Sequence, residues 1–259
     1  MEFEIIDFHT HPFLSPLTNI CNHPDVFNMD TDYTLSLMKE LGVSKICGSV
    51  AFVGEYGSSW WDKIKHNNDE ALKLKEIYGD FYIPGFHVHP DYIRESMEEI
   101  ERMHAMGIDL IGELVPYLDG WGSFTNKNFY EILKLCEEYE MTLSLHSGDV
   151  PEQGMIAEAF PRLKVVSAHP GEYHDFMRHV EWMNKCDNFY LDLSGYGIFR
   201  HGMLRSGIDK CGVEKFIFGS DYPTCNPAMY IGAVTLDPSI KDSEREMILA
   251  GNAKRILGI

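Results

Sequence analysis

The sequence predicts an α/β protein folded as a single (β/α)8 TIM barrel that spans residues 1–259. Short apolar runs alternate with longer amphipathic patterns along the whole chain, which is typical of repeated βα units and a parallel sheet. Eight such units can be counted. A chain of 259 residues also has the usual length of one barrel domain.

The expected strands are short β-like runs that alternate with longer helical patterns. In chain order they are Phe3–Phe8, Lys45–Val50, Phe81–Phe86, Leu110–Leu114, Thr142–Leu145, Lys164–Ala168, Phe189–Leu193 and Lys215–Gly219. In a barrel their carboxyl ends all open at one face, so residues far apart in sequence meet there.

The expected helices lie between and after the strands, each with an apolar face toward the barrel and a polar face outward. They are Asp32–Leu41, Asn67–Tyr78, Ile93–Met106, Asn126–Tyr139, Gly154–Phe160, Tyr173–Asn184, His201–Cys211 and Ser243–Leu257. Two longer stretches, Phe13–Thr31 and Val115–Thr125, follow the first and fourth strands. Loops at this face build substrate sites, so we expect both stretches to cover one.

The composition of the chain limits the classes of molecule that the protein can bind. The formal net charge of −18, with no cluster of Lys and Arg, opposes binding to nucleic acid or to an acidic membrane surface. The N-terminus lacks the pattern of a signal peptide, and no apolar run is long enough to span a membrane. We therefore expect a cytoplasmic protein with a small-molecule substrate, and a homo-oligomer is compatible with the sequence. The six cysteines form no CxxC pair and are expected to be reduced thiols.

A His-x-His motif follows the first strand. His9 and His11 are two residues apart, so on a strand both imidazoles point to the same face, and we expect Asp7 to share it. Imidazole nitrogen is a good ligand for zinc and similar ions. The motif alone is weak evidence, because two histidines at this spacing are common without a metal.

Four later strands also end in a residue type that binds metals. Glu113, His146, His169 and Asp221 each stand at or just after the carboxyl end of an expected strand. Because these ends converge in a barrel, the sequence predicts one site built from all of them.

Several motifs together resemble the amidohydrolase superfamily, specifically its amidohydrolase-related (amidohydrolase-2) branch. They are Asp7-Phe8-His9-Thr10-His11, Leu145-His146, Ala168-His169-Pro170-Gly171, Phe218-Gly219-Ser220-Asp221-Tyr222-Pro223 and the closing Gly251-Asn252-Ala253-Lys254-Arg255-Ile256-Leu257-Gly258. The resemblance covers essentially the whole chain and implies a barrel with a divalent metal, zinc being the expected ion.

The resemblance also implies roles for the residues. It makes metal ligands of His9, His11, His146 and Asp221, with His169 polarising the substrate or holding the attacking water. Asp221 would take a proton from that water, whose pKa the metal lowers, and return it to the leaving group. Asp221 and His169 are thus the candidate catalytic residues.

Glu113 decides the number of ions. Two-metal members of the superfamily place a bridging carboxylated lysine or glutamate at the end of strand four, where Glu113 lies. If Glu113 bridges, His9, His11 and Asp221 hold one ion while His146 and His169 hold a second. If it does not, it orients a ligand or contacts substrate, and the chain holds one ion.

Four further residues are candidate substrate contacts. His87 and His89 form a second His-x-His pair after the third strand, and we assign them to the substrate pocket because the first pair fills the metal positions. Tyr196 and Arg200 follow the seventh strand. Arg200 could clamp a substrate carboxylate, although it could equally pair with a surface acid.

The expected activity is hydrolysis, by metal-activated water, of an amide, lactone or ester-like bond in a small molecule. A nonoxidative decarboxylase of the same branch, using the same ligands, is the alternative. A TatD-type metal-dependent nuclease ranks third, because the net charge of −18 opposes a phosphodiester polyanion.

Overall fold

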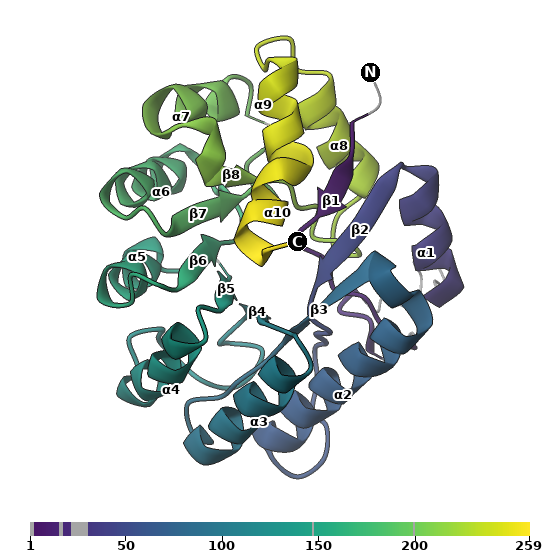
Figure 1. Ribbon diagram of the computed structural model, residues 1–259, viewed down its shortest axis with the longest axis vertical. Helices are drawn as coiled ribbons and strands as arrows, with labels where there is room; N and C mark the ends of the chain where they lie inside the picture. Colours follow the sequence, from purple (N-terminus) through teal and green to yellow (C-terminus); the bar gives the residue numbers. More distant parts are fainter. Residues whose placement is uncertain (1–2, 16–17, 22–30, 147, 199) are drawn as a thin grey trace.

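Eight parallel strands form one curved sheet in the order β1 to β8 (Figure 1). The computed structural model describes residues 3–15, 18–21, 31–146, 148–198 and 200–259. The strands are β1 Ile5–Asp7, β2 Val43–Gly48, β3 Tyr82–Phe86, β4 Leu110–Leu114, β5 Thr142–Leu145, β6 Lys164–Ser167, β7 Phe189–Asp192 and β8 Phe216–Ile217. Each lies within about two residues of its expected range.

Backbone hydrogen bonds between the first and last strands close the barrel. The Phe8 amide donates to the Phe218 carbonyl at 3.0 Å, and the His11 amide donates to the Tyr222 carbonyl at 2.7 Å. A third bond joins the Asp221 amide to the His9 carbonyl at 2.8 Å. The expected (β/α)8 TIM barrel is therefore confirmed. The last two bonds also fix the loop after β8 against the His-x-His motif.

The helices surround the strands (Figure 1). They are α1 Thr31–Glu40, α2 Trp60–Tyr78, α3 Ile93–Ala105, α4 Lys127–Glu138, α5 Val150–Ala159, α6 Tyr173–Lys185, α7 Met203–Cys211, α8 Pro227–Thr235, α9 Asp242–Glu246 and α10 Asn252–Leu257, with the shorter turns η2 Gly79–Phe81, η3 Val213–Lys215 and η4 Met247–Gly251. Within the described ranges, none of these helices has the length and apolarity needed to cross a membrane.

Four helical assignments differ from the sequence prediction, and local capping explains three of them. Helix α5 begins four residues before the expected Gly154, because the side chain of Asp149 accepts from the Glu152 amide at 3.1 Å. Helix α2 begins seven residues before the expected Asn67, because Ser59 and Asp62 form a reciprocal capping box. Helix α8 was not predicted. It starts at Pro227, and the preceding residue, Asn226, caps it: the Asn226 side chain accepts a hydrogen bond from the Ala228 amide at 3.0 Å. The expected last helix is divided into α9, η4 and α10. Much of the expected first loop, residues 16–17 and 22–30, lies outside the described residues.

Apolar side chains pack in two layers. The outer layer fills the space between strands and helices. The inner cluster lies inside the barrel and contains Ile6, Phe8, Cys47, Leu110, Val166, Tyr190 and Ile217, with Ala253 and Ile256 of α10. Helix α10 therefore covers the amino-terminal end of the barrel, where the Thr142 hydroxyl donates to the Ile256 carbonyl at 3.3 Å. The opposite end is left for the site.

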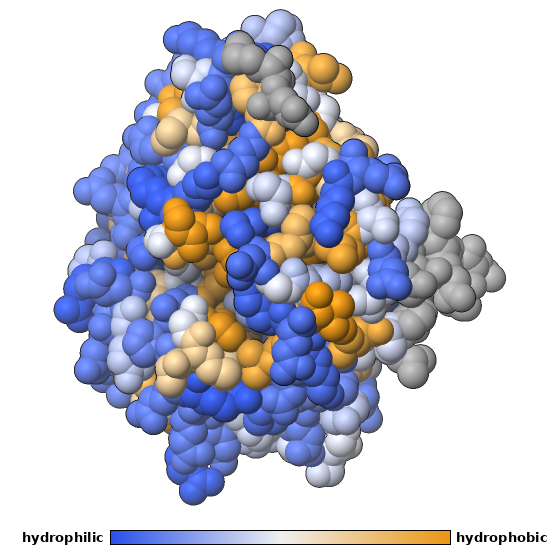
Figure 2. Space-filling view, turned by 45° about the vertical axis from the view of Figure 1, so that its right-hand side comes forward, coloured by the Kyte–Doolittle hydropathy of each residue, from blue (hydrophilic) through white to orange (hydrophobic). Residues whose placement is uncertain are grey.

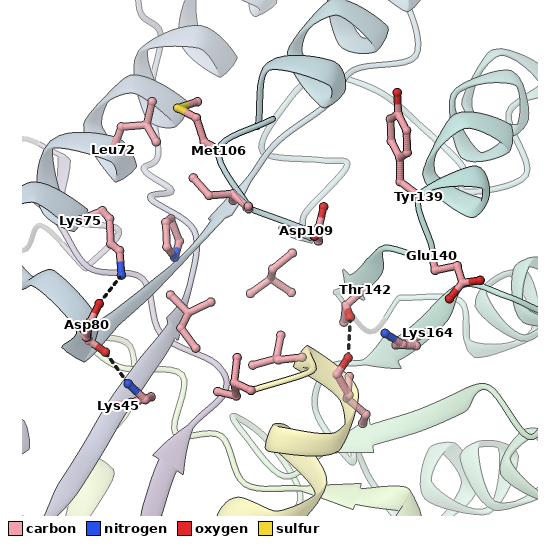
Figure 3. A pocket seen from close by; sticks show the side chains of 18 of the residues that line it. Lys45, Leu72, Lys75, Asp80, Met106, Asp109, Tyr139, Glu140, Thr142 and Lys164 are labelled. Carbon is pink, nitrogen blue, oxygen red and sulfur yellow. Dashed lines mark hydrogen bonds and ion pairs between the residues drawn. The ribbon is translucent and has the colours of Figure 1, made fainter. Parts of the chain in front are cut away.

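A cavity of about 780 Å³ lies at the end that α10 partly covers (Figure 3). Figure 2 shows this side of the molecule turned by 45°, with apolar side chains gathered in its middle and hydrophilic ones around them. The cavity is lined by residues such as Lys45, Ile83, Leu110 and Ile256, and its described lining contains none of the predicted metal ligands. Its size therefore says nothing about catalysis.

The stability of the barrel is expected to fall in mild acid because of His179. This histidine of α6 is buried, with Nε2 2.8 Å from the Ser167 hydroxyl and Nδ1 2.9 Å from the Asp175 carbonyl. Burial lowers its pKa to about 4. In the unfolded chain this histidine has a pKa of about 6.5. Between the two pKa values the unfolded chain therefore binds a proton that the folded chain does not bind.

The contribution of neutral His179 to the free energy of unfolding is fully present above about pH 6.5 and is lost as the pH falls towards about 4. About 2 kcal/mol of the free energy of unfolding is lost by pH 5. Urea unfolding at pH 7 and pH 5 measures it. The variant His179→Gln serves as the control, because it should show a smaller loss over the same interval. An equal loss in both proteins would contradict this role.

Candidate metal centre

The barrel brings the six predicted metal ligands together at the carboxyl ends of its strands. His9 and His11 follow β1, Glu113 lies within β4, and the other three follow β5, β6 and β8: His146, His169 and Asp221. All six lie in two overlapping groups of potential ligand atoms. Asp7 is buried beside them, but its carboxylate accepts from the amide and hydroxyl of Ser220 at 2.9 and 2.5 Å.

The first group surrounds one oxygen of Glu113. The Nε2 atoms of His9 and His11 are 3.2 Å apart, so the two imidazoles point to the same side. Both atoms face Glu113 Oε2, at 3.4 and 3.3 Å. Asp221 Oδ1 completes the group at 3.8 Å from the His9 nitrogen and 3.6 Å from the His11 nitrogen.

The second group surrounds the other oxygen of the same carboxylate. Glu113 Oε1 lies 2.9 Å from His146 Nδ1 and 3.4 Å from His169 Nε2. The rings of these two histidines contact each other edge to face, with centroids 4.9 Å apart. The carboxylate of Glu113 thus lies between two sets of imidazoles, one on each oxygen.

Hydrogen bonds behind the histidines orient them. His9 Nδ1 is 2.9 Å from Asp192 Oδ2, His11 Nδ1 is 3.0 Å from the Ser49 carbonyl, and His169 Nδ1 is 3.0 Å from the Ser194 hydroxyl. A donor bond from Nδ1 leaves the lone pair on Nε2, the atom that faces Glu113. Asp192 also forms a possible ligand group with His9 and His169. We assign it the orienting role, because it faces the Nδ1 side of His9.

Asp192 was not among the predicted site residues, although its position in the sequence carries a signal. It is the last residue of β7 and stands at a strand end like the predicted ligands. Ser49 and Ser194 left no comparable signal, because a backbone carbonyl can come from any residue and serine occurs in many loops.

The backbone around the centre takes conformations that ordinary positions avoid. Gly112 has a φ of +94°, and a Cβ there would lie 2.2 Å from the Ser144 carbonyl oxygen, so only glycine fits before Glu113. His169 and Asp221 have φ values of 65° and 61°, in the left-handed region that costs free energy for residues with a side chain. Such strain is concentrated at functional sites in proteins.

Charge is concentrated in this buried volume. Burial raises the pKa of Glu113, but the imidazoles of His9 and His146 outweigh burial and hold that pKa well below its usual value. Burial lowers the pKa of His9, but Glu113 and Asp192 raise it well above its usual value. The carboxylates therefore need positive charge beside them, which protons supply on the histidines or a metal ion supplies in their place.

The donor set fits a divalent ion. Imidazole nitrogens and carboxylate oxygens suit zinc and manganese alike. Metal–ligand bonds of about 2.0–2.1 Å place the ligands of a tetrahedral ion about 3.3 Å apart. The separations in the first group, 3.2 to 3.8 Å, are close to that value. His9, His11, Glu113 and Asp221 could hold one ion, and Glu113, His146 and His169 a second.

The second His-x-His pair lies outside this cluster. His87 and His89 are 2% and 0% exposed, and their Nε2 atoms lie 2.9 Å from the Val50 carbonyl and 2.8 Å from the Asp119 carbonyl. The carboxylate of Asp119 lies 3.4 Å from His87 and 3.5 Å from the buried ammonium of Lys63. The pair therefore holds neighbouring loops, and the rings of His87 and His89 offer almost no exposed surface to a substrate.

Removing the charge of Asp119 is expected to destabilise the barrel. In Asp119→Asn the buried Lys63 loses its carboxylate partner, which commonly costs about 3 kcal/mol. Chemical unfolding measures the loss, and Asp91→Asn, on the exposed surface of the same region, is the matched control. Equal unfolding midpoints for Asp119→Asn and wild type would show that the network contributes nothing.

Tyr196 and Arg200, the two candidate substrate contacts after β7, bind a glutamate and do not face the metal-ligand cluster. Arg200 forms an ion pair of 2.5 Å with Glu172, and the hydroxyl of Tyr196 donates to the same carboxylate. All three side chains are substantially exposed. Of the alternatives left open for Arg200, the structure shows the pairing with a surface acid.

Comparisons with known proteins agree with this architecture. A family model described as "Amidohydrolase", that of the amidohydrolase-2 family, matches residues 6–259. The fold and the match define an enzyme of the metal-dependent amidohydrolase class. The chain belongs to the amidohydrolase-2 family, as the sequence motifs predicted. No curated protein sequence matches the chain.

Solved structures share the fold at low identity. An uncharacterized TIM-barrel protein from Bordetella bronchiseptica is 21% identical, with a TM-score of 0.77 and 98% of each chain covered. A dihydroxybenzoic acid decarboxylase from Polaromonas sp., with bound manganese and the inhibitor 2-nitroresorcinol, is 15% identical, with a TM-score of 0.71 and 99% of this chain and 97% of that chain covered. A probable 2-pyrone-4,6-dicarboxylic acid hydrolase from Acinetobacter baumannii, with citric acid bound, is 17% identical, with a TM-score of 0.69 and 100% of both chains covered.

Proposed function

We propose that the chain is a metal-dependent hydrolase of a lactone, amide or ester-like bond in a small molecule, with two divalent ions bridged by Glu113. One observation carries the proposal: the two oxygens of Glu113 face separate groups of imidazoles, at 3.3 to 3.4 Å on one side and 2.9 to 3.4 Å on the other. Two cations this close repel each other and need an anionic bridge. His9, His11 and Asp221 would hold one ion, and His146 and His169 the second.

The ions would supply Lewis-acid chemistry, polarising a substrate oxygen and making water more acidic. Asp221 is assigned the proton transfer. Its Oδ1 faces His9 and His11, and Asp221 would take a proton from the attacking water and return it to the leaving group. His169, whose Nδ1 is 3.0 Å from the Ser194 hydroxyl, would hold the second ion through Nε2.

A nonoxidative decarboxylase is the second candidate, favoured by the similarity to the Polaromonas decarboxylase. The same ligands would then hold an ion that binds substrate oxygens. That structure contains manganese, so both manganese and the expected zinc belong in the experiments.

The test is a product screen with metal analysis. Protein stripped by a chelator, verified by elemental analysis, and reloaded with Zn²⁺ or Mn²⁺ is incubated with lactones, pyrone carboxylates, anilides and dihydroxybenzoates. Ring opening or amide cleavage without release of carbon dioxide supports the hydrolase, and carbon dioxide release supports the second candidate. Full turnover by verified metal-free protein would contradict both.

A further inference from the structure

The candidate metal centre is open to solvent on one side. The side chains of His9, His11 and Glu113 are 1 to 4% exposed, while that of His146 is 24% exposed. His169, in ring contact with His146, also lines a cavity of about 290 Å³ whose walls include Gly148 to Pro151. A substrate therefore reaches the centre over the imidazoles of His146 and His169.

Tyr117 lies on this route. Its side chain is 68% exposed, in the loop after β4, and its ring contacts the ring of His146 edge to face with centroids 5.5 Å apart. Its phenolic hydroxyl can donate a hydrogen bond.

The residues that follow Tyr117 are held by an unusually polar buried network. The ammonium of Lys63 donates to the Leu118 carbonyl at 2.6 Å, and His89 donates to the Asp119 carbonyl at 2.8 Å. The Asp119 carboxylate is itself buried between Lys63 and His87. Buried ionic groups are costly and serve to fix one geometry where they are retained. Here Lys63, His87, His89 and Asp119 fix the backbone that directly follows Tyr117, and so fix the position of its exposed ring.

We propose that Tyr117 is a substrate-binding residue whose ring forms one wall for a planar cyclic substrate and whose hydroxyl donates to an anionic or carbonyl oxygen of that substrate. The second His-x-His pair, with Lys63 and Asp119, positions it. An exposed aromatic ring beside a polar centre stacks against planar rings better than against puckered ones. The inference rests on the proposed function and narrows its substrates to planar cyclic molecules that offer an acceptor oxygen.

Calorimetric binding to the metal-loaded protein tests this without turnover. The probes are 2,6-dihydroxybenzoate, which is planar, and cyclohexanecarboxylate, which is not. Wild type is compared with Tyr117→Leu, Tyr117→Phe and Tyr33→Leu, the last altering an exposed tyrosine on α1. Metal content and melting temperature are recorded for each protein.

We expect Tyr117→Leu to bind the planar probe about tenfold more weakly than wild type, with a smaller change for cyclohexanecarboxylate. Tyr117→Phe should lose part of the affinity, because it keeps the ring and lacks the hydroxyl donor, and Tyr33→Leu should lose none. Unchanged affinity in a metal-loaded Tyr117→Leu, equal losses for both probes, or no binding of the planar probe by wild type would each overturn the proposal. Binding is scored apart from products, so failure of the proposed chemistry remains a separate result.

Discussion

Replacing Glu113 by glutamine is expected to lower the metal content from about two ions per chain to about one. Glutamine keeps the size of the side chain but removes the negative charge that lies between the two groups of imidazoles. His146 and His169 are neutral as ligands and cannot by themselves compensate two adjacent cations. Elemental analysis of protein dialysed against excess zinc or manganese measures the difference, and turnover should fall with it.

The matched control is Glu99→Gln. Glu99 is equally buried, at 4% exposure, but pairs with Arg102 away from the strand ends. This variant should melt at a lower temperature and keep the wild-type metal content. If wild type and Glu113→Gln both hold one ion, the two-ion assignment is wrong, and Glu113 becomes an orienting or substrate-contacting residue.

Replacing Asp221 by asparagine is expected to reduce turnover by about 10²- to 10⁴-fold, the usual contribution of a general acid or base. The substitution removes the proton acceptor while keeping the shape of a side chain that is 10% exposed. Turnover, metal content and melting temperature should be measured on the same preparation, because Asp221 is also a candidate ligand. Asp209→Asn, on the exposed face of α7, is the control for loss of one carboxylate.

Near-normal turnover in a folded, metal-loaded Asp221→Asn protein would remove Asp221 from the proton transfer. A loss of turnover that follows the loss of metal, and that is restored by higher metal concentration, would assign it to metal binding alone. The proposed double role requires a loss that added metal does not restore.

The strands could be predicted from sequence because parallel barrel strands are short, apolar and separated by amphipathic helices. The prediction was weaker where local hydrogen bonds decide a boundary. The start of α2 depends on Ser59 and Asp62, and the start of α8 depends on Asn226 and Pro227. These signals occupy two or three residues and carry no periodicity, so a pattern of hydrophobic residues does not show them.

Much of the candidate site could be predicted as well, because residues at the carboxyl ends of parallel strands must meet. Sequence could not show that Glu113 faces both groups of imidazoles, since that depends on the backbone at Gly112 and on side-chain direction. It also could not separate the two His-x-His pairs by burial. His87 and His89 follow β3 in the same way that His9 and His11 follow β1. The Nε2 atoms of His87 and His89, however, form hydrogen bonds with backbone carbonyls.

The most direct test of the account is a crystal structure of the manganese-loaded protein with anomalous diffraction data collected at the manganese edge. The account predicts two anomalous peaks about 3.5–4 Å apart, one on each side of the Glu113 carboxylate. His9, His11 and Asp221 should surround one peak, and His146 and His169 the other. A single peak held by His9, His11, His146 and Asp221, with Glu113 outside its coordination sphere, would contradict the two-ion centre.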